Sequence, residues 1–140
     1  MILALTTIAV VVVDQALKLL LRRGEFQTVR LGPYASLGVV EGRLWVDRFG
    51  GHSPKVSWLW AFSAAGLVVA SVLMPASGIF VGLMLGGSLS NAVEVSRRGS
   101  VTDYVCIRFW PAFNLADVAL TVGAIGIAAE LLRAINGSTG

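Results

Sequence analysis

Charged side chains are scarce in this chain. Only 14% of its residues are Asp, Glu, Lys or Arg, against about a quarter in an ordinary soluble domain. Hydrophobic residues make up 56% of the chain, and the mean hydropathy is +0.79. This balance excludes a typical soluble domain and predicts an integral membrane protein.

Cysteine and histidine are each present once. The single cysteine, Cys106, excludes an intramolecular disulfide and any metal motif built from several cysteines. The single histidine, His52, stands beside two glycines, where an ordinary loop histidine is the simpler explanation. The net charge of +3 is spread over short connections, which suits anionic lipid headgroups better than nucleic acid. We therefore expect no cofactor, no metal site and no nucleic-acid partner.

Long apolar runs are what the chain has in abundance. A spanning helix needs about 20 residues, so the chain has room for four spans and one modest loop region. The runs predict helices at about residues 1–21, 56–74, 78–95 and 113–135. The predicted fold is an all-α integral membrane protein with four transmembrane helices, forming a single membrane domain over residues 1–140.

The polar segment 22–54 interrupts these runs. It holds five of the 11 basic residues, several glycines and short β-type runs such as FQTVRL and RLWV. We predict a small β element on the membrane surface here, after the first helix. Trp45, Phe49 and Trp58 are placed to lie at the membrane interface.

The first helix carries Asp14 and Lys18, four positions apart and therefore on one face. It lacks the basic leader and cleavage site of a secretory signal peptide. A salt bridge near the membrane boundary, with Lys18 extending toward the headgroups, is one explanation of the pair. A role at a functional site is the other, and the sequence leaves both open.

The third helix changes character along its length. Its small residues, among them Gly82, Gly86 and Gly87, are typical of closely packed membrane helices. Packing does not explain Asn91 and Glu94, which lie three apart on one face at the far end. These two are candidates for a functional site.

Three of the eight acidic residues fall between residues 86 and 117, including Asp103 and Asp117. An acid near membrane depth is a functional-site hypothesis by default, although an acid in the first turn of a helix, as at Asp117, also stabilises the helix dipole. The connection carrying Asp103 joins the third and fourth helices, so the two acids can converge. Neighbouring carboxyl groups share a proton and can act as base and acid toward water and a peptide bond.

The run GGSLSNAVEVSRRGSVTD, followed by FNLAD, resembles the bacterial lipoprotein signal peptidases, also called signal peptidase II. The family pattern is roughly GGALGN, then Asp-Arg, then G-x-V-x-D and F-N-x-A-D. In this alignment Asp103 and Asp117 match the two catalytic aspartates, and Asn91 and Asn114 match the two motif asparagines. DQALK in the first helix is similar to the family's D-x-x-x-K.

The resemblance implies an aspartic endopeptidase that removes signal peptides from diacylglyceryl-modified prolipoproteins, just before the lipid-bearing cysteine. Its partners would be that substrate and membrane lipids, in the bacterial cytoplasmic membrane. Asp103 and Asp117 would activate water and protonate the leaving group. The remaining residues would bind substrate or support the site: Asn91, Asn114, Glu94, Asp14 and Lys18.

Several positions depart from the family pattern. Glu94 and Val95 stand where the family has Asp and Arg, and Ala35 and Ser36 occupy the positions of its Arg-Asn-x-Gly motif. These changes indicate a divergent member or paralogue. A non-catalytic relative that binds a lipoprotein or partner helix stays open. A proton-conducting or transport subunit is a third alternative, but it would spread its acids across the bilayer.

The basic residues and the resemblance disagree about orientation. Most basic residues lie in the two predicted polar loops, and the positive-inside rule would place these in the cytoplasm. The resemblance implies the opposite, with the acids at the outer leaflet. We follow the resemblance, because these arginines can instead serve lipid headgroups or substrate.

Overall fold

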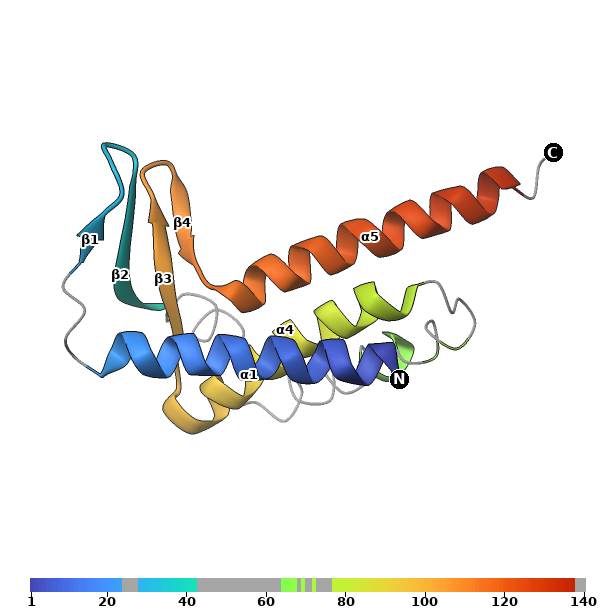
Figure 1. Cartoon of the computed structure of the whole chain (residues 1–140), viewed down its shortest axis with the longest axis horizontal. Coiled ribbons are helices and arrows are strands. Elements are labelled where there is room, and N and C mark those ends of the chain that lie inside the picture. The colour runs from blue at the N-terminus through green and yellow to red at the C-terminus, as the bar shows by residue number, and fades with distance from the viewer. Residues whose placement is uncertain (24–27, 43–63, 68, 70–71, 73–76, 138–140) are drawn as a thin grey trace.

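The computed structural model describes residues 1–23, 28–42, 64–67, 69, 72 and 77–137. Its long helices are α1 (Ile2–Arg22), α4 (Gly78–Arg98) and α5 (Leu115–Gly137). Its strands are β1 (Val29–Arg30), β2 (Ala35–Gly42), β3 (Val101–Ile107) and β4 (Trp110–Phe113). The helices extend from one end of the molecule, where the sheet lies across them (Figure 1).

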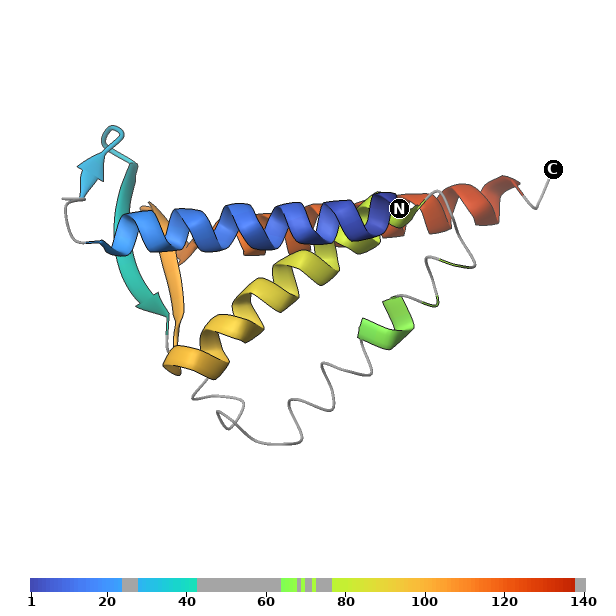
Figure 2. The same ribbon diagram turned by 60° about the horizontal axis from the view of Figure 1, so that its bottom comes forward.

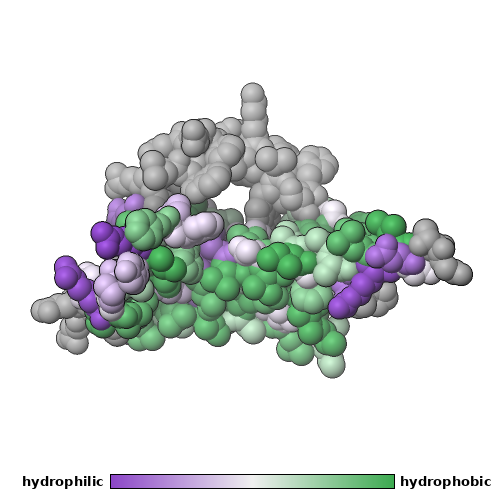
Figure 3. Space-filling view, turned by 90° about the horizontal axis from the view of Figure 1, so that it is seen from above, coloured by the Kyte–Doolittle hydropathy of each residue, from purple (hydrophilic) through white to green (hydrophobic). Residues whose placement is uncertain are grey.

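All three long helices are long and apolar enough to cross a membrane. Many large apolar side chains of α1 and α5 are exposed, whereas the buried residues include Asp14, Lys18 and Glu94. Figure 3 shows an apolar middle region, with hydrophilic groups toward the two ends. An apolar exterior around a polar interior is what a lipid-embedded bundle requires. The predicted second span, residues 56–74, lies largely outside the described residues, of which 64–67 are helical.

Glycines on α4 allow it to pack closely against both neighbours, which Figure 2 shows converging on it. A side chain at Gly86 would meet the Thr7 carbonyl oxygen of α1 at 2.9 Å. A side chain at Gly87 would collide with the Ala116 carbonyl oxygen of α5. These contacts confirm that the small residues serve helix packing.

The end of α4 directs the chain into the sheet. The predicted helix ends at residue 95, but α4 continues to Arg98. Gly99 then adopts a left-handed conformation with φ 71°, and its N–H donates to the Val95 carbonyl at 2.8 Å. Glycine adopts this conformation without a steric penalty. The turn places β3 directly after the helix.

The four strands form one antiparallel sheet in the order β1-β2-β3-β4. The predicted β element, at residues 22–54, therefore covers only part of the sheet, because β3 and β4 lie in the connection between α4 and α5. The predicted run RLWV lies outside the described residues, and the longest strand is β2, which the sequence analysis did not single out. Pairing of β2 with β3 places Val40 opposite Asp103.

Candidate active site

Asp103 and Asp117 come together at the sheet end of the bundle. Asp103 lies on β3, and Asp117 lies in the first turn of α5. Both acids line one cavity of about 500 Å³. The cavity is otherwise lined by one polar residue and several apolar ones: Asn91, Val101, Trp110, Pro111, Ala112 and Phe113.

A capping box fixes the position of Asp117. The Asp117 N–H donates to the Asn114 side-chain oxygen at 3.0 Å, and the Asn114 N–H donates to the Asp117 carboxylate at 3.1 Å. Such reciprocal bonds satisfy two of the donors left free at a helix N-terminus. Asn114 is fully buried. The FNLAD motif therefore starts the helix and orients its acid at the same time.

The two motif asparagines connect the acids to each other. Asn114 Nδ2 donates to Asp103 Oδ1 at 2.9 Å, and Asn91 Nδ2 donates to Asp117 Oδ1 at 2.9 Å. The amide groups also meet, with Asn114 Nδ2 3.3 Å from Asn91 Oδ1. Each carboxyl group thus receives a side-chain hydrogen bond from a different asparagine, and the four residues form one network.

Lys18 lies beneath this network and is buried. Its Nζ is 2.7 Å from Asp14, 3.0 Å from Glu94 and 2.8 Å from the Asn91 side-chain oxygen. The explanation in which Lys18 extends to the headgroups is therefore wrong. A buried ammonium is tolerated because two carboxylates and an amide oxygen surround it. Asn91 links Lys18 to Asp117, because its side-chain oxygen accepts from Lys18 and its side-chain nitrogen donates to Asp117.

Glu94 joins α4 to α1 and the sheet. Besides Lys18, it pairs with Arg22 and accepts bonds from the Thr102 backbone and hydroxyl at 3.1 and 2.6 Å. Thr102 directly precedes Asp103, so these bonds hold β3 against the helices. Glu94 is one methylene group longer than the aspartate of the family motif, and it takes part in the ion-pair network with Lys18 and Arg22.

Asp14 anchors the start of α5. Its carboxylate accepts a bond from Ser90 at 2.6 Å and one from the Ala116 N–H at 3.1 Å. Ala116 is the neighbour of Asp117. The seven predicted site residues therefore lie in one connected region, in which Asp14, Lys18 and Glu94 are not among the residues that line the cavity.

Sequence reasoning missed several residues of this region: Arg22, Ser90, Thr102 and Tyr104. Tyr104 accepts a bond from the Leu115 N–H at 2.9 Å. The alternation of β-branched and aromatic residues in VTDYVCI is a strand signal that could have placed Thr102 and Tyr104 together on the inner face of β3.

The surroundings of Asp103 change its acidity. Burial, followed by the nearby negative charge of Asp117, raises the pKa of Asp103 to about 6, although the hydrogen bond from Asn114 acts in the opposite direction. Burial also raises the pKa of Tyr104 to about 12. Asp103 therefore holds a proton far more readily than a solvated aspartate does.

Within the described ranges, no cluster of three or more His, Cys, Asp or Glu residues is arranged to hold a metal ion. Cys106 lies on β3 beyond the cavity of the acids, and His52 lies outside the described residues. The polar side chains that line the cavity are two carboxyl groups and the Asn91 amide.

The signal peptidase (SPase) II family model matches residues 6–133. The chain belongs to this family. Membership confirms the resemblance found in the sequence motifs and identifies a membrane-protein family of aspartic peptidases that processes prolipoproteins.

Curated relatives agree with the family assignment. The lipoprotein signal peptidase of Methylorubrum extorquens is 33% identical over 141 residues, covering 90% of this chain and 82% of its own. That of Syntrophomonas wolfei is 34% identical, covering 66% of this chain and 71% of its own. That of Paraburkholderia phytofirmans is 39% identical over 92 residues, so the match spans about half of each chain, 56% and 54%.

Two solved structures share the fold. Both are bacterial membrane enzymes determined by the in meso method, at 1.9 and 2.3 Å resolution, and both are 22% identical to this chain. Their TM-scores are 0.72 and 0.69, with 92% of this chain covered in each comparison and 91% and 86% of the other chains. At this identity the likeness concerns the fold alone.

Proposed function

We propose that this chain is an intramembrane aspartic endopeptidase that removes signal peptides from diacylglyceryl-modified prolipoproteins. One observation carries the proposal: Asp103 and Asp117, from a strand and a helix, line one cavity and are joined through Asn91 and Asn114. Family membership supplies the reaction class. Cleavage would fall just before the lipid-modified cysteine.

In the proposed reaction, Asp103 begins as the acid and Asp117 as the base. Water attacks the peptide carbonyl carbon, giving its proton to Asp117, while Asp103 donates a proton to the carbonyl oxygen. Asp117 then protonates the amide nitrogen and Asp103 takes back a proton from one hydroxyl group. The C–N bond breaks, releasing an amine and a carboxylic acid.

The different surroundings of the two acids support this assignment of roles. The raised pKa of Asp103, about 6, favours the protonated form needed in an acid. Asp117 accepts bonds from the Asn91 amide and the Asn114 N–H at a helix N-terminus. These donors stabilise its negative charge.

The apolar walls of the cavity suit a lipidated substrate. Trp110, Phe113 and Asp117 also line a second cavity of about 250 Å³, whose remaining walls are Val118, Thr121 and Val122 on α5. This surface leads from the acids along the helix, toward the apolar region of the bundle. We assign it to the signal-peptide helix or the acyl chains, since both are excluded from water.

The finer architecture is also part of the proposal: a single domain, residues 1–140, with four spans in the bacterial cytoplasmic membrane and the acids at the outer leaflet. β2 ends near the sheet end of the bundle, while α4 begins at the far end (Figure 1). In the proposed architecture, a transmembrane span at residues 56–74 carries the chain from one side of the membrane to the other between β2 and α4.

A non-catalytic, lipoprotein-binding relative is the second candidate. It is favoured by Val95, Ala35 and Ser36, which replace an arginine and an Arg-Asn pair of the family motifs. Loss of substrate-holding groups would leave a groove that binds without cutting. Arg22, which pairs with Glu94, places a cation beside the altered position, which supports the catalytic candidate instead.

A gel-shift assay on a diacylglyceryl-modified prolipoprotein tests the proposal. The parent protein in lipid should convert the substrate to the mature form, and Asp117→Asn should not. Glu130→Gln, which removes a carboxylate further along α5 and outside both cavities, is the matched control and should cleave normally. Substrate that binds without cleavage by the parent protein would establish the non-catalytic candidate.

A further inference from the structure

A separate cavity of about 260 Å³ lies on the sheet, at the β1–β2 turn and the end of β3. It has no lining residue in common with the cavity of the two acids. Side chains alternate along a strand, so Cys106, which lines it, faces the opposite side of β3 from Asp103. Ser36 and Cys106 are partners in the β2–β3 ladder and define its floor.

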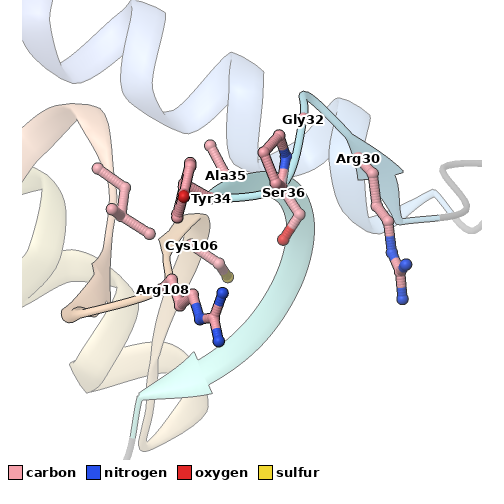
Figure 4. Close-up of a pocket in the computed structure, with 9 residues that line it drawn as sticks. Arg30, Gly32, Tyr34, Ala35, Ser36, Cys106 and Arg108 are labelled. Atoms are coloured by element: carbon pink, nitrogen blue, oxygen red, sulfur yellow. The ribbon is translucent and has the colours of Figure 1, made fainter.

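Two arginines give this cavity a positive charge. Arg30 and Arg108 both line it, and none of the described residues that line it is acidic. Across the described segments, neither guanidinium group forms a salt bridge. Ser36 lies between the two arginines in Figure 4, and Tyr34 brings a second hydroxyl group. Two guanidinium groups and two hydroxyl groups form a donor set that suits a phosphate.

The position of the cavity indicates where that phosphate comes from. The strands run across the helix axes, and the β1–β2 and β3–β4 turns extend on the same side, away from α1 and past the start of α5 (Figure 1). Because spanning helices lie near the membrane normal, this sheet lies along the membrane surface. Its turns then reach over lipid next to the bundle.

Exposed apolar side chains on both turns support a lipid neighbour. Leu31 is 61% exposed and Phe109 81%. Aromatic rings are favoured at the depth of the headgroups, and Arg108 lies over the Phe109 ring, 5.5 Å from its centre. The cationic cavity and the apolar turns thus present a phosphate site directly beside acyl-chain contacts.

We propose that Arg30 and Arg108 bind the phosphate of an anionic phospholipid, with Ser36 and Tyr34 as additional donors and the apolar turn residues against its glycerol and acyl region. The bound lipid holds the β2–β3 part of the sheet at the membrane surface. This binding does not depend on the proposed cleavage, since no group of the acid network takes part.

Native mass spectrometry of the full chain in detergent tests the proposal, with phosphatidylglycerol and phosphatidylcholine of identical acyl chains as probes. The parent protein should bind the first phosphatidylglycerol more tightly. The double variant Arg30→Gln/Arg108→Gln should weaken that binding about tenfold or more, with little change for phosphatidylcholine. Should the double variant fail to fold, each single variant should weaken binding about threefold.

Arg97→Gln/Arg98→Gln is the matched control, because it removes the same charge from exposed positions at the sheet end of α4, outside the cavity. It should change phosphatidylglycerol binding less than about twofold. Equal losses in both double variants would overturn the proposal, as would equal binding of the two lipids by the parent. Displacement of phosphatidylglycerol by equimolar inorganic phosphate would identify a free anion as the ligand and overturn it too.

Discussion

Asn114 Nδ2 donates a hydrogen bond to Asp103 Oδ1 across 2.9 Å, linking the N-terminus of α5 to β3. The same residue caps the helix that carries Asp117. A single side chain therefore determines both where the helix starts and how the strand's acid points toward it.

Replacing Asn114 by alanine should lower kcat about 100-fold, because the Asp103 carboxyl group loses its bond from Nδ2 and the Asp117 backbone N–H loses its acceptor. Loss of the helix cap should also cost about 1 kcal/mol of stability. Cleavage rates and melting temperatures of Asn114→Ala and Ser96→Ala measure the two effects. Ser96 is exposed and donates to the backbone of its own helix, so its variant should match the parent. Parent-like cleavage by Asn114→Ala would remove the asparagine from the site.

Lys18→Met should destabilise the protein by about 3–5 kcal/mol, since it leaves the buried carboxylates of Asp14 and Glu94 without their shared cation. Arg133→Met is the control, because the Arg133–Glu130 pair is exposed and contributes less than about 1 kcal/mol. Thermal unfolding in one detergent compares the variants. Equal melting temperatures would show that the buried network adds little to stability.

The raised pKa of Asp103 predicts a pH-dependent stability. The Asp103 carboxyl group makes its full contribution to the free energy of unfolding below its unfolded pKa of about 4. This contribution is lost as the pH rises through the folded pKa of about 6. Asp103→Asn should thus be more stable than the parent at pH 7.5, by about 1 kcal/mol after allowance for solvent screening. The gain should vanish at pH 4. A pH-independent difference would contradict the raised pKa.

The same pKa predicts how activity responds to pH. In the proposed mechanism Asp103 must carry a proton, so kcat/KM should fall as the pH rises above about 6. Initial rates on the lipidated substrate, measured across a buffer series at constant ionic strength, give this profile. A rate that increases through this range would reverse the assignment of acid and base.

Gly87→Ala should lower both stability and cleavage, because its new methyl group collides with the Ala116 carbonyl and separates α4 from α5 next to Asp117. Gly78→Ala is the control, as nothing lies within 4 Å of a side chain there. We expect a loss of about 1–3 kcal/mol for the first variant and little change for the second. Similar melting temperatures would mean that the helices adjust freely.

The helices were predictable because lipid requires long apolar runs, a pattern visible without tertiary information. α1, α4 and α5 lie close to the predicted ranges. The sheet was predictable only in part, since β3 and β4 depend on pairing with β2, far away in the sequence. The alternation in VTDYVCI is a strand signal, but it does not identify the partner strand.

The residues of the site were predictable from motifs, whereas their contacts were not. Asp14 and Lys18, one turn apart, form the same local pair at a surface or in a core. Only the packing of α4 brings Glu94 and Asn91 to Lys18. Arg22 and Thr102 carried no motif signal, because their roles arise from burial beside Glu94 rather than from spacing.

The site is assembled from segments that are synthesised at different times, because β2 pairs with β3 and β3 contacts the start of α5. A nascent chain that has emerged only through α4 already contains Asp14, Lys18 and Glu94, but neither Asp103 nor Asp117. The proposed hydrolytic pair is complete only once β3 and the first turn of α5 have joined the bundle. Under the proposed mechanism, a nascent chain that still lacks α5 does not cut neighbouring membrane segments.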